Sequence, residues 1–212
     1  MCDEIKRSCI DCMGSACEDD DNDMKYPPFC MHVNMKPELR AESVEKFRNN
    51  EEFLQMSMQS AAVESEGYGV WPRVKEICEF AKRMGYKKIG IATCVGLLAE
   101  SRAMAKLLRH YGFEVVGISC KSGQVTKQEI GYTDNNCGLG DYICNPILQA
   151  TVLNDEKTDM NIIMGLCVGH DTLFIKHSDA PITVGVTKDR VTGHNPVQPL
   201  YQLNSYYSKL LK

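Results

Sequence analysis

The sequence lacks any hydrophobic run long enough to cross a membrane. Its longest apolar stretch, residues 89–99, contains two glycines and is about half the ~20 residues that a bilayer-spanning helix needs. The first seven residues are polar and lead into no apolar signal core. We therefore expect a cytoplasmic protein that neither spans nor enters a membrane.

An excess of basic residues is missing as well. The chain has 24 Lys and Arg against 28 Asp and Glu, which gives a net charge of −4. Residues 1–35 carry eight of the acids and three of the bases, so the rest of the chain is close to neutral. Proteins that bind nucleic acid carry a basic surface, and we expect no nucleic acid among the partners of this protein. No internal repeat is present.

Cysteine, by contrast, is abundant, with 11 residues in a chain of 212. A chain of this length with 43% hydrophobic residues can bury its own core and does not depend on disulfides. Reduced cytosolic thiols are more often metal ligands or catalytic groups. Because 11 thiols exceed what one site can use, we expect two metal sites and a few structural cysteines.

Hydrophobic periodicity divides the chain into three expected parts. Residues 1–35 are a polar, cysteine-rich segment, residues 36–85 form a helical linker packed on the body, and residues 86–212 form an α/β domain. Within the linker, apolar residues at helical spacing predict one long amphipathic helix over residues 37–66 and a second helix over 74–84. The apolar residues of 201–211 predict a last packed helix.

Strands and helices alternate in the third part. The apolar runs 87–93, 113–119, 161–166 and 182–187 predict strands, and the segments 97–111, 146–155 and 170–177 predict helices between them. This alternation favours a Rossmann-like open parallel sheet of about four strands with flanking helices. A strand order of 2-1-3-4 would place a switch point, where ligands bind, between the first and third strands.

The amino-terminal segment contains four thiols and an imidazole at metal-ligand spacing: Cys9, Cys12, Cys17, Cys30 and His32. A Cys-x2-Cys turn directs two sulfur atoms at one ion, and a second pair closes a tetrahedral shell. The segment has few apolar residues, so metal binding would supply its folding energy. We expect structural zinc or a second iron–sulfur cluster here. Cys17, Cys30 and His32 remain alternatives for completing the shell.

A second set of cysteines follows the expected strands. Cys94, Cys120 and Cys167 each come after a strand, and parallel strands end at one edge of the sheet. The irregular segment between residues 121 and 144 adds Cys137 and Cys144. We expect Cys94, Cys137, Cys144 and Cys167 to bind a 4Fe-4S cluster, with Cys120 as a substitute. The alternative is that these cysteines are small hydrophobic residues at the ends of buried strands.

Polar residues near the same edge are candidates for catalysis. His170 and Asp171 begin a helix after the third strand, and Asp189 follows the fourth strand. They are candidates for proton transfer. A histidine at a helix start can also be an ordinary cap, and a loop rich in Asp, Arg and Gly an ordinary turn. The residues Lys188 and Arg190 could hold an anionic substrate.

Several of these motifs together resemble a known but uncharacterised protein family. They are the Cys-x2-Cys-x4-Cys opening, the stretch IGIATC at 89–94, the stretch GLCVGHD at 165–171, and the segment 189–196. The family occurs mainly in archaea and anaerobic bacteria and is described as metal-binding, with a zinc-finger-like segment. The resemblance implies metal binding but transfers no reaction.

The sequence thus predicts a metal-binding protein, with an iron–sulfur enzyme as the leading interpretation. The cluster would bind or reduce a small, anionic substrate, as in an oxidoreductase or lyase, and the amino-terminal metal would be structural. A non-enzymatic metallochaperone, sensor or electron carrier is the alternative, and an adaptor that binds protein through its zinc segment is a third. A redox partner protein and a homo-oligomer are compatible with each interpretation.

Overall fold

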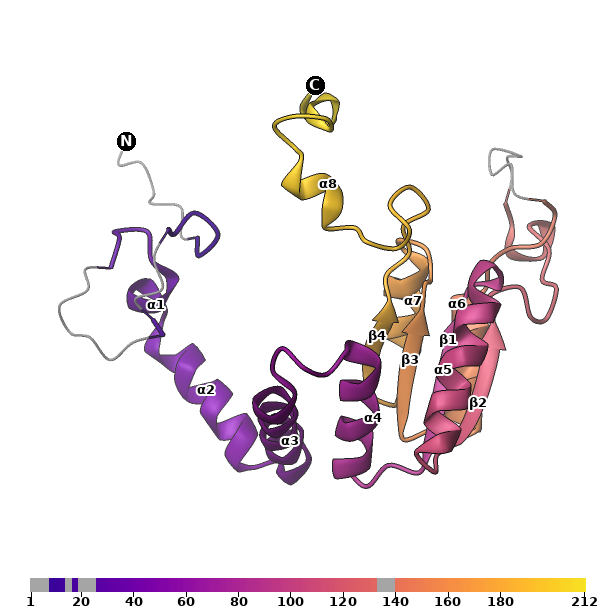
Figure 1. Ribbon diagram of the computed structural model, residues 1–212, viewed down its shortest axis with the longest axis horizontal. Coiled ribbons are helices and arrows are strands. Elements are labelled where there is room, and N and C mark those ends of the chain that lie inside the picture. The colour runs from indigo at the N-terminus through magenta and orange to yellow at the C-terminus, as the bar shows by residue number, and fades with distance from the viewer. Residues whose placement is uncertain (1–7, 14–16, 19–25, 133–139) are drawn as a thin grey trace. The chain divides into compact units, whose positions relative to one another are not determined.

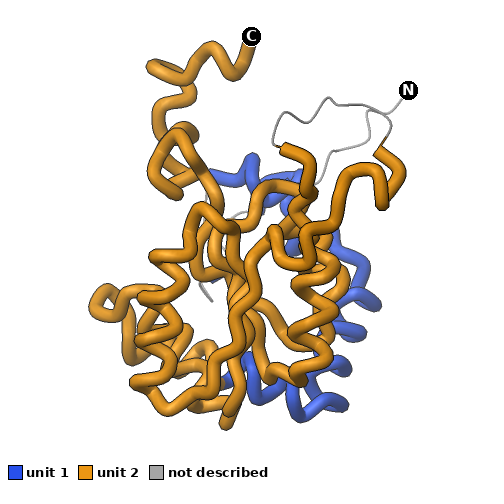
Figure 2. The backbone as a smooth tube through the Cα atoms, turned by 90° about the vertical axis from the view of Figure 1, so that its right-hand side faces the viewer, with its two compact units in different colours: residues 1–58 blue, residues 59–212 orange. Residues whose placement is uncertain are grey.

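The structure is a computed structural model that describes residues 8–13, 17–18, 26–132 and 140–212. The chain forms two compact units, residues 1–58 and 59–212, which Figure 2 shows in blue and orange. We describe each unit by itself. The boundary between them falls within helix α3 (Glu51–Gly67).

The first unit contains two short helices and the start of α3. Helix α1 spans Met31–Asn34 and α2 spans Pro37–Arg48. The single helix that we predicted over residues 37–66 is wrong, because the chain is interrupted between α2 and α3. Asn49 ends α2 through its backbone N–H, which donates to the carbonyl of Glu45 (2.9 Å). Asn50 then accepts a hydrogen bond from the backbone of Phe53 (3.1 Å) and begins α3.

The second unit continues with the elements of an α/β domain. In chain order they are α4 (Arg73–Arg83), β1 (Lys88–Thr93), η1 (Val95–Leu97), α5 (Leu98–His110), β2 (Glu114–Ser119), η2 (Gln128–Ile130), α6 (Pro146–Asp155), β3 (Met160–Met164), α7 (His170–His177), β4 (Ile182–Val186), α8 (Gln198–Tyr201) and η3 (Ser208–Leu211). The four predicted strands are confirmed, with bounds that differ by at most two residues.

All four strands are parallel and lie in the order β2-β1-β3-β4, the order that places a switch point between β1 and β3. Their carboxyl ends therefore point to the same edge of the sheet, as the arrowheads in Figure 1 show. We call this edge the carboxyl rim. The segments after β2 and β4 both leave the sheet there (Figure 1).

Helices cover both faces of the sheet and create two hydrophobic clusters. On one face, residues of α4 and α5 pack against β1 and β3, with Cys78, Ile89 and Leu108 fully buried. On the other face, residues of α6 and α7 pack against β1 and β3, with Leu153 and Phe174 fully buried. The alternation of side chains along each strand supplies both clusters, as is typical of a doubly covered parallel sheet.

Carboxylates and cations pair with each other at the amino ends of the strands. Lys88 at the start of β1 contacts Glu114 and Glu156, each at 3.1 Å. The carboxylate of Asp159 accepts hydrogen bonds from the backbone N–H groups of Lys87 (2.6 Å) and Lys88 (2.8 Å). Each charged group named here thus has a partner within the protein.

The carboxyl-terminal segment does not form the packed helix that we predicted. It contains only the short α8 and η3. The side chains of Tyr201, Tyr206 and Leu211 are each about two-thirds exposed or more. Pro199 stands inside the first turn of α8 and the segment lacks a long amphipathic stripe. In the described part of the chain, no helix has both the length and the apolar character that a membrane span requires.

Candidate functional site

Backbone hydrogen bonds continue the sheet beyond its strands and bring the strand-end cysteines together. The N–H of Cys120, directly after β2, donates to the carbonyl of Thr93 at the end of β1 (2.8 Å). The N–H of Cys94 donates to the carbonyl of Met164 at the end of β3 (3.2 Å). Cys167 follows three residues after β3. The rim therefore receives one cysteine from each of three neighbouring strands, as the sequence predicted.

A fourth thiol reaches the rim from the far end of the segment after β2. The N–H of Asn145 donates to the carbonyl of Cys120 (2.8 Å), which places Cys144 beside Cys120. The side chain of Asn145 accepts from the N–H of Leu148 (2.9 Å) and so caps α6, where Pro146 is the first residue. Cys137, the other predicted ligand in this segment, lies outside the described residues.

Two of the described rim thiols, Cys94 and Cys144, lie within electrostatic reach of Cys120. Cys94 and Cys120 are 8% and 3% exposed, and Cys144 packs against the same hydrophobic cluster. Burial raises the pKa of Cys120 to about 12; the backbone N–H of Val95 opposes this shift, and the charges of Cys144 and Cys94 add to it. A neutral Cys120 thiol also forms a hydrogen bond with Cys144.

Two cations from the segment after β4 contact rim sulfur atoms. Lys188 Nζ lies 3.5 Å from Cys94 Sγ, and Arg190 Nη2 lies 3.1 Å from Cys167 Sγ. The hydrogen bond to Cys167, and after it the charges of Cys167, Cys94 and Cys144, raise the pKa of Arg190. Alternate residues of an extended segment project to the same side, which explains why residues 188 and 190 both reach the thiols.

Asp189, between these two cations, is held by its own loop. Its carboxylate accepts hydrogen bonds from the N–H groups of Val191 (2.8 Å) and Thr192 (3.1 Å). The side chain of Thr192, followed by the N–H of Val191, holds the pKa of Asp189 below its ordinary value. The imidazole of His194 accepts from the N–H of Asp189 (3.1 Å). These contacts order the loop that carries the two cations, and a catalytic role of Asp189 stays a prediction.

His170 and Asp171 begin α7 beside Cys167. Their backbone N–H groups donate to the carbonyl of Cys167 at 2.9 and 3.1 Å. The carboxylate of Asp171 accepts from the N–H groups of Gly169 (2.9 Å) and Thr172 (2.7 Å), which organises the helix start. Both residues are partly exposed near the rim, and their predicted roles in proton transfer are untested by these contacts.

Sequence reasoning missed a buried polar residue beneath the rim. Gln149 of α6 is fully buried, and its side-chain N–H2 group donates to the carbonyls of Thr93 (3.1 Å) and Ile118 (2.8 Å). Its Oε1 has no hydrogen-bond partner within the described residues. Gln149 thus ties together the ends of β1 and β2, which carry Cys94 and Cys120. Its only signal in the sequence is a polar residue among the apolar residues of α6.

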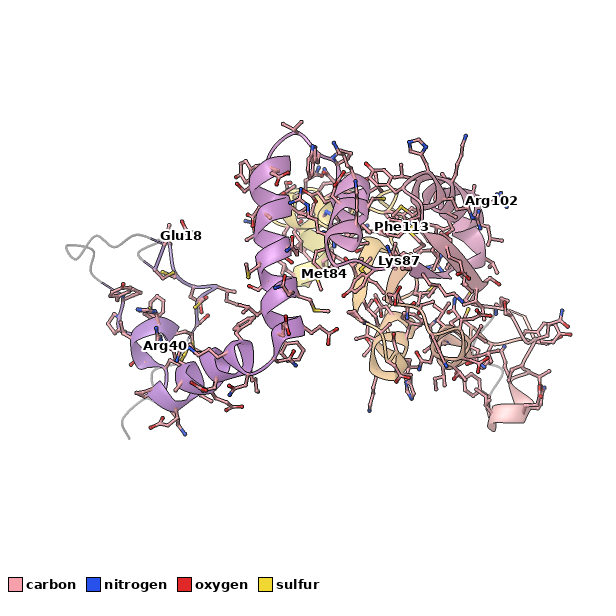
Figure 3. All side chains as sticks on the ribbon, turned by 90° about the horizontal axis from the view of Figure 1, so that it is seen from below. Glu18, Arg40, Met84, Lys87, Arg102 and Phe113 are labelled. Atoms are coloured by element: carbon pink, nitrogen blue, oxygen red, sulfur yellow. The ribbon has the colours of Figure 1, made fainter. Side chains whose placement is uncertain are left out.

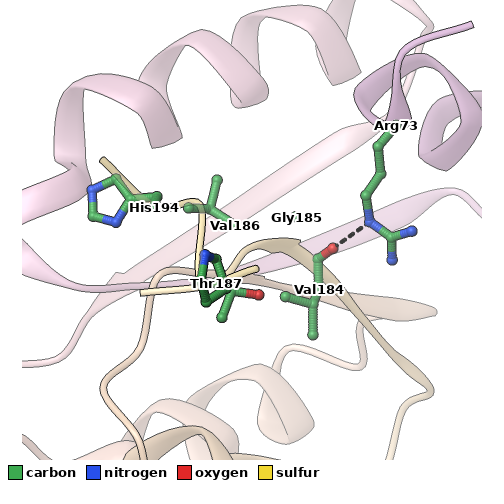
Figure 4. A pocket seen from close by; sticks show the side chains of 7 residues that line it. Arg73, Val184, Gly185, Val186, Thr187 and His194 are labelled. Carbon is green, nitrogen blue, oxygen red and sulfur yellow. Dashed lines mark hydrogen bonds between the residues drawn. The ribbon is translucent and has the colours of Figure 1, made fainter. Parts of the chain in front are cut away.

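A separate hollow lies along the free edge of β4. It has a volume of about 420 Å³, and Arg73, Val186, Thr187 and His194 are among the residues that line it. Figure 4 shows Arg73 reaching the edge strand, where its Nε donates to the carbonyl of Val184 (2.7 Å). This contact covers an edge carbonyl that another strand could otherwise use.

The amino-terminal cysteines lie in the first unit, residues 1–58. The N–H of Cys12 donates to the carbonyl of Cys9 (3.1 Å), so the Cys-x2-Cys sequence forms a turn. The N–H of Ser8 donates to the carbonyl of Phe29 (3.2 Å), which brings this turn near Cys30. Cys9 and Cys17 are exposed, Cys30 is buried, and the ring of His32 stacks on Tyr26 with centroids 5.2 Å apart.

Neither set of cysteines is a closed ligand shell. Over residues 8–13, 17–18, 26–132 and 140–212, no three His, Cys, Asp or Glu side chains come together as a group that could hold a metal ion. The rim contains four thiols from four chain segments, and two of these thiols are each contacted by a cation. Its donors are sulfur atoms, the donor type of zinc and iron–sulfur sites.

Comparison with known proteins gives two findings. A family described as "Protein of unknown function (DUF1847)" matches residues 30–184 of this chain. The chain is also 43% identical over 176 residues to "Uncharacterized protein MJ0455" of the archaeon Methanocaldococcus jannaschii, a match that covers 83% of this chain and 89% of that protein.

Proposed function

The chain belongs to the DUF1847 family of proteins of unknown function, and from the contents of its rim we propose that it is a metal-binding protein and an iron–sulfur enzyme. In this proposal the carboxyl rim holds a 4Fe-4S cluster that binds or reduces a small anionic substrate. The observation that carries the proposal is the approach of four thiols from four separate segments to one edge of the sheet.

The contacts of Lys188 and Arg190 favour ligation over a purely structural role for these thiols. Cysteines that serve only as small hydrophobic residues are packed by apolar groups. At the rim, an ammonium group and a guanidinium group lie 3.5 and 3.1 Å from the sulfur atoms of Cys94 and Cys167. Cations at these positions stabilise thiolates, the form in which cysteine binds metal.

The donor set fits the proposed group by its chemistry. Cys94, Cys144 and Cys167 would be ligands, and Cys120 or Cys137 would supply the fourth thiolate. Cys120 is protonated in the metal-free site because burial raises its pKa to about 12, and the positive charge of a metal would favour the loss of that proton. When bound, an iron–sulfur cluster would exchange single electrons and, with one iron free of cysteine, coordinate a substrate.

The surrounding residues would then bind and orient the substrate. Lys188 and Arg190 would attract an anion to the rim, and His170 or Asp171 would exchange a proton with it. Asp189 would act through the loop that positions the two cations. A His170→Ala variant should keep the cluster and lose affinity for the ligand or turnover.

A non-enzymatic carrier is the second candidate, and one observation favours it. The described rim thiols already number four, enough to ligate every iron of a cluster without leaving one open. Such a closed site would suit electron transfer, sensing or metal delivery rather than substrate binding. Electron-spin resonance of the reduced protein with and without added anions separates the two: only an open iron should change its spectrum.

Anaerobic purification tests the rim proposal directly. We expect a brown protein with broad absorption near about 400 nm from thiolate-to-iron charge transfer, and iron and sulfide in near-equal amounts. Reconstitution with iron and sulfide should increase both. A colourless protein that holds only zinc after reconstitution would contradict the cluster.

At the amino terminus we propose a separate structural site for zinc or a second cluster, held by Cys9, Cys12 and two of Cys17, Cys30 and His32. The Cys-x2-Cys turn and its proximity to Cys30 support this site. The Cys9→Ser/Cys12→Ser double variant should lose about one metal equivalent and the protection of residues 8–13 and 26–35 from hydrogen exchange, while the sheet stays folded. Unchanged metal content in that variant would rule the site out.

A further inference from the structure

Lys188 and Arg190 differ from the other contacting cations of the second unit in the atoms that they contact. Within the described residues, neither forms an ion pair with a carboxylate, whereas Lys88 contacts two glutamates and Arg83 contacts Glu66. The polar side-chain contacts of Lys188 and Arg190 go to the sulfur atoms of Cys94 and Cys167. Their positive charge is therefore directed at the thiols.

The number of these cations matches one particular metal site. A dication held by four thiolates carries a net charge of minus two. Two such negative charges at a partly buried rim would be unfavourable without compensation, and the two cations that contact its sulfur atoms, Lys188 and Arg190, would offset them. Only three thiolates around the same dication would leave the rim with a net positive charge.

We infer that Lys188 and Arg190 are the counter-charges of a four-thiolate site around a dicationic centre, formed by Cys94, Cys120, Cys144 and Cys167. This inference rests on the proposed metal binding at the rim, in the closed form that the carrier would use, and adds which residues balance the charge of that site. The two residues act on the metal through the ligand sulfur atoms, as N–H···S donors, and do not contact it themselves. Residues that orient and neutralise metal ligands typically change metal affinity by about 10–100-fold when they are replaced.

Zinc is the probe, because it is a dication that tetrahedral thiolate sites bind without redox chemistry. The full-length Cys9→Ser/Cys12→Ser chain serves as the parent, so that uptake at the amino-terminal site does not obscure the rim. Affinity for Zn²⁺ is measured by competition with a chelator. Arg190→Met and Lys188→Met should each weaken binding by roughly 10–100-fold, and Arg190→Lys should restore most of the loss because it keeps the charge.

Arg102→Met is the matched control. Arg102 is an exposed arginine of α5 that Figure 3 shows at the outside of the molecule. Its replacement removes the same charge from the same unit without touching a thiol, so zinc affinity should be unchanged. Circular dichroism of every variant checks that the fold is retained.

A double-mutant cycle tests the pairing of each cation with its own sulfur. Arg190→Met should cost much less when Cys167 is already replaced by Ser, and Lys188→Met should cost much less in a Cys94→Ser chain. A purely structural role of the two cations in the loop would give the same loss in both backgrounds.

The possible outcomes separate the inference about Lys188 and Arg190 from the proposed metal site at the rim. Weaker zinc binding in both cation variants, with coupling to their own cysteines, supports the inference even if no iron–sulfur cluster assembles. Unchanged zinc affinity in Arg190→Met and Lys188→Met overturns the inference while the metal site itself stands. Absence of zinc binding in the parent chain overturns the inference together with the rim metal site.

Discussion

The two ends of the parallel sheet handle charge in different ways. At the amino ends, Lys88 is paired with two glutamates and the carboxylate of Asp159 accepts backbone N–H groups. At the carboxyl ends, Lys188 and Arg190 contact sulfur atoms, and no carboxylate of the described chain neutralises them. At the amino ends, each of these charged groups already has a partner within the protein. At the carboxyl ends, the two cations gain negatively charged partners when the thiols are ionised, and metal binding causes that ionisation.

The largest expected difference between the two ends concerns metal content. Cys94→Ser, Cys144→Ser and Cys167→Ser should each lose the same rim cluster, because removal of one thiolate opens the metal to water. Iron and sulfide analysis after anaerobic reconstitution measures this loss. Cluster retention in both Cys94→Ser and Cys167→Ser would remove the basis for a site at the carboxyl end.

Cys78 supplies the control cysteine, because it is fully buried in the cluster between α4 and the sheet, away from the rim set. Cys78→Ser should keep the metal and lower the free energy of unfolding by about 1–3 kcal/mol, since it buries a hydroxyl group. Chemical denaturation of the metal-loaded protein measures the change. Loss of metal from this variant, with none from Cys94→Ser, would reverse the roles that we assign.

At the amino end the expected effect is one of stability alone. Asp159→Ala should lower the free energy of unfolding by about 1 kcal/mol, because the N–H groups of Lys87 and Lys88 lose a charged acceptor. Asp159→Asn keeps one acceptor and should lose less. Metal content should be unchanged in both variants, and a coupled loss of metal would contradict the separation between the two ends.

The last expected effect, confined to alkaline pH, is a pH dependence of stability from Cys78. Burial raises the pKa of this thiol from 9.0 to about 11, and the charge of Glu79 adds to the shift. The folded state therefore favours the neutral thiol, and its contribution to stability is complete below pH 9 and is lost as the pH rises through about 11. Between these pH values Cys78→Ala should lose less stability than the wild type in parallel denaturation curves. Identical pH profiles would mean that Cys78 titrates as in the unfolded chain.

The sequence was sufficient to predict the sheet because each strand has a continuous apolar run and the connections are helical. The approach of Cys94, Cys120 and Cys167 to one rim follows from the common direction of parallel strands. The break between α2 and α3 was missed although Asn49 and Asn50 mark it, because the apolar spacing continues across them.

The details of the rim depend on contacts between residues far apart in the sequence. The alternation of side chains along the segment after β4 could predict that Lys188 and Arg190 point to the same side of that segment. It could not predict which sulfur atom each of them contacts. Because of the same alternation, the side chain of Asp189 points to the other side, where it accepts hydrogen bonds from its own loop. Gln149 could not be recognised, because its partners are main-chain carbonyls of β1 and β2, which no residue type signals.

The strand order also has a consequence for how the protein is made. β1 lies between β2 and β3 in the sheet, yet it precedes both in the chain, and β4 with its two cations comes last. At typical rates of translation, Arg190 leaves the ribosome roughly 5 to 20 s after Cys94. During that interval the other rim thiols are added one after another, and the two cations follow last. If the rim binds a metal as proposed, its full set of thiols and counter-charges exists only after the residues that follow β4 have been synthesised.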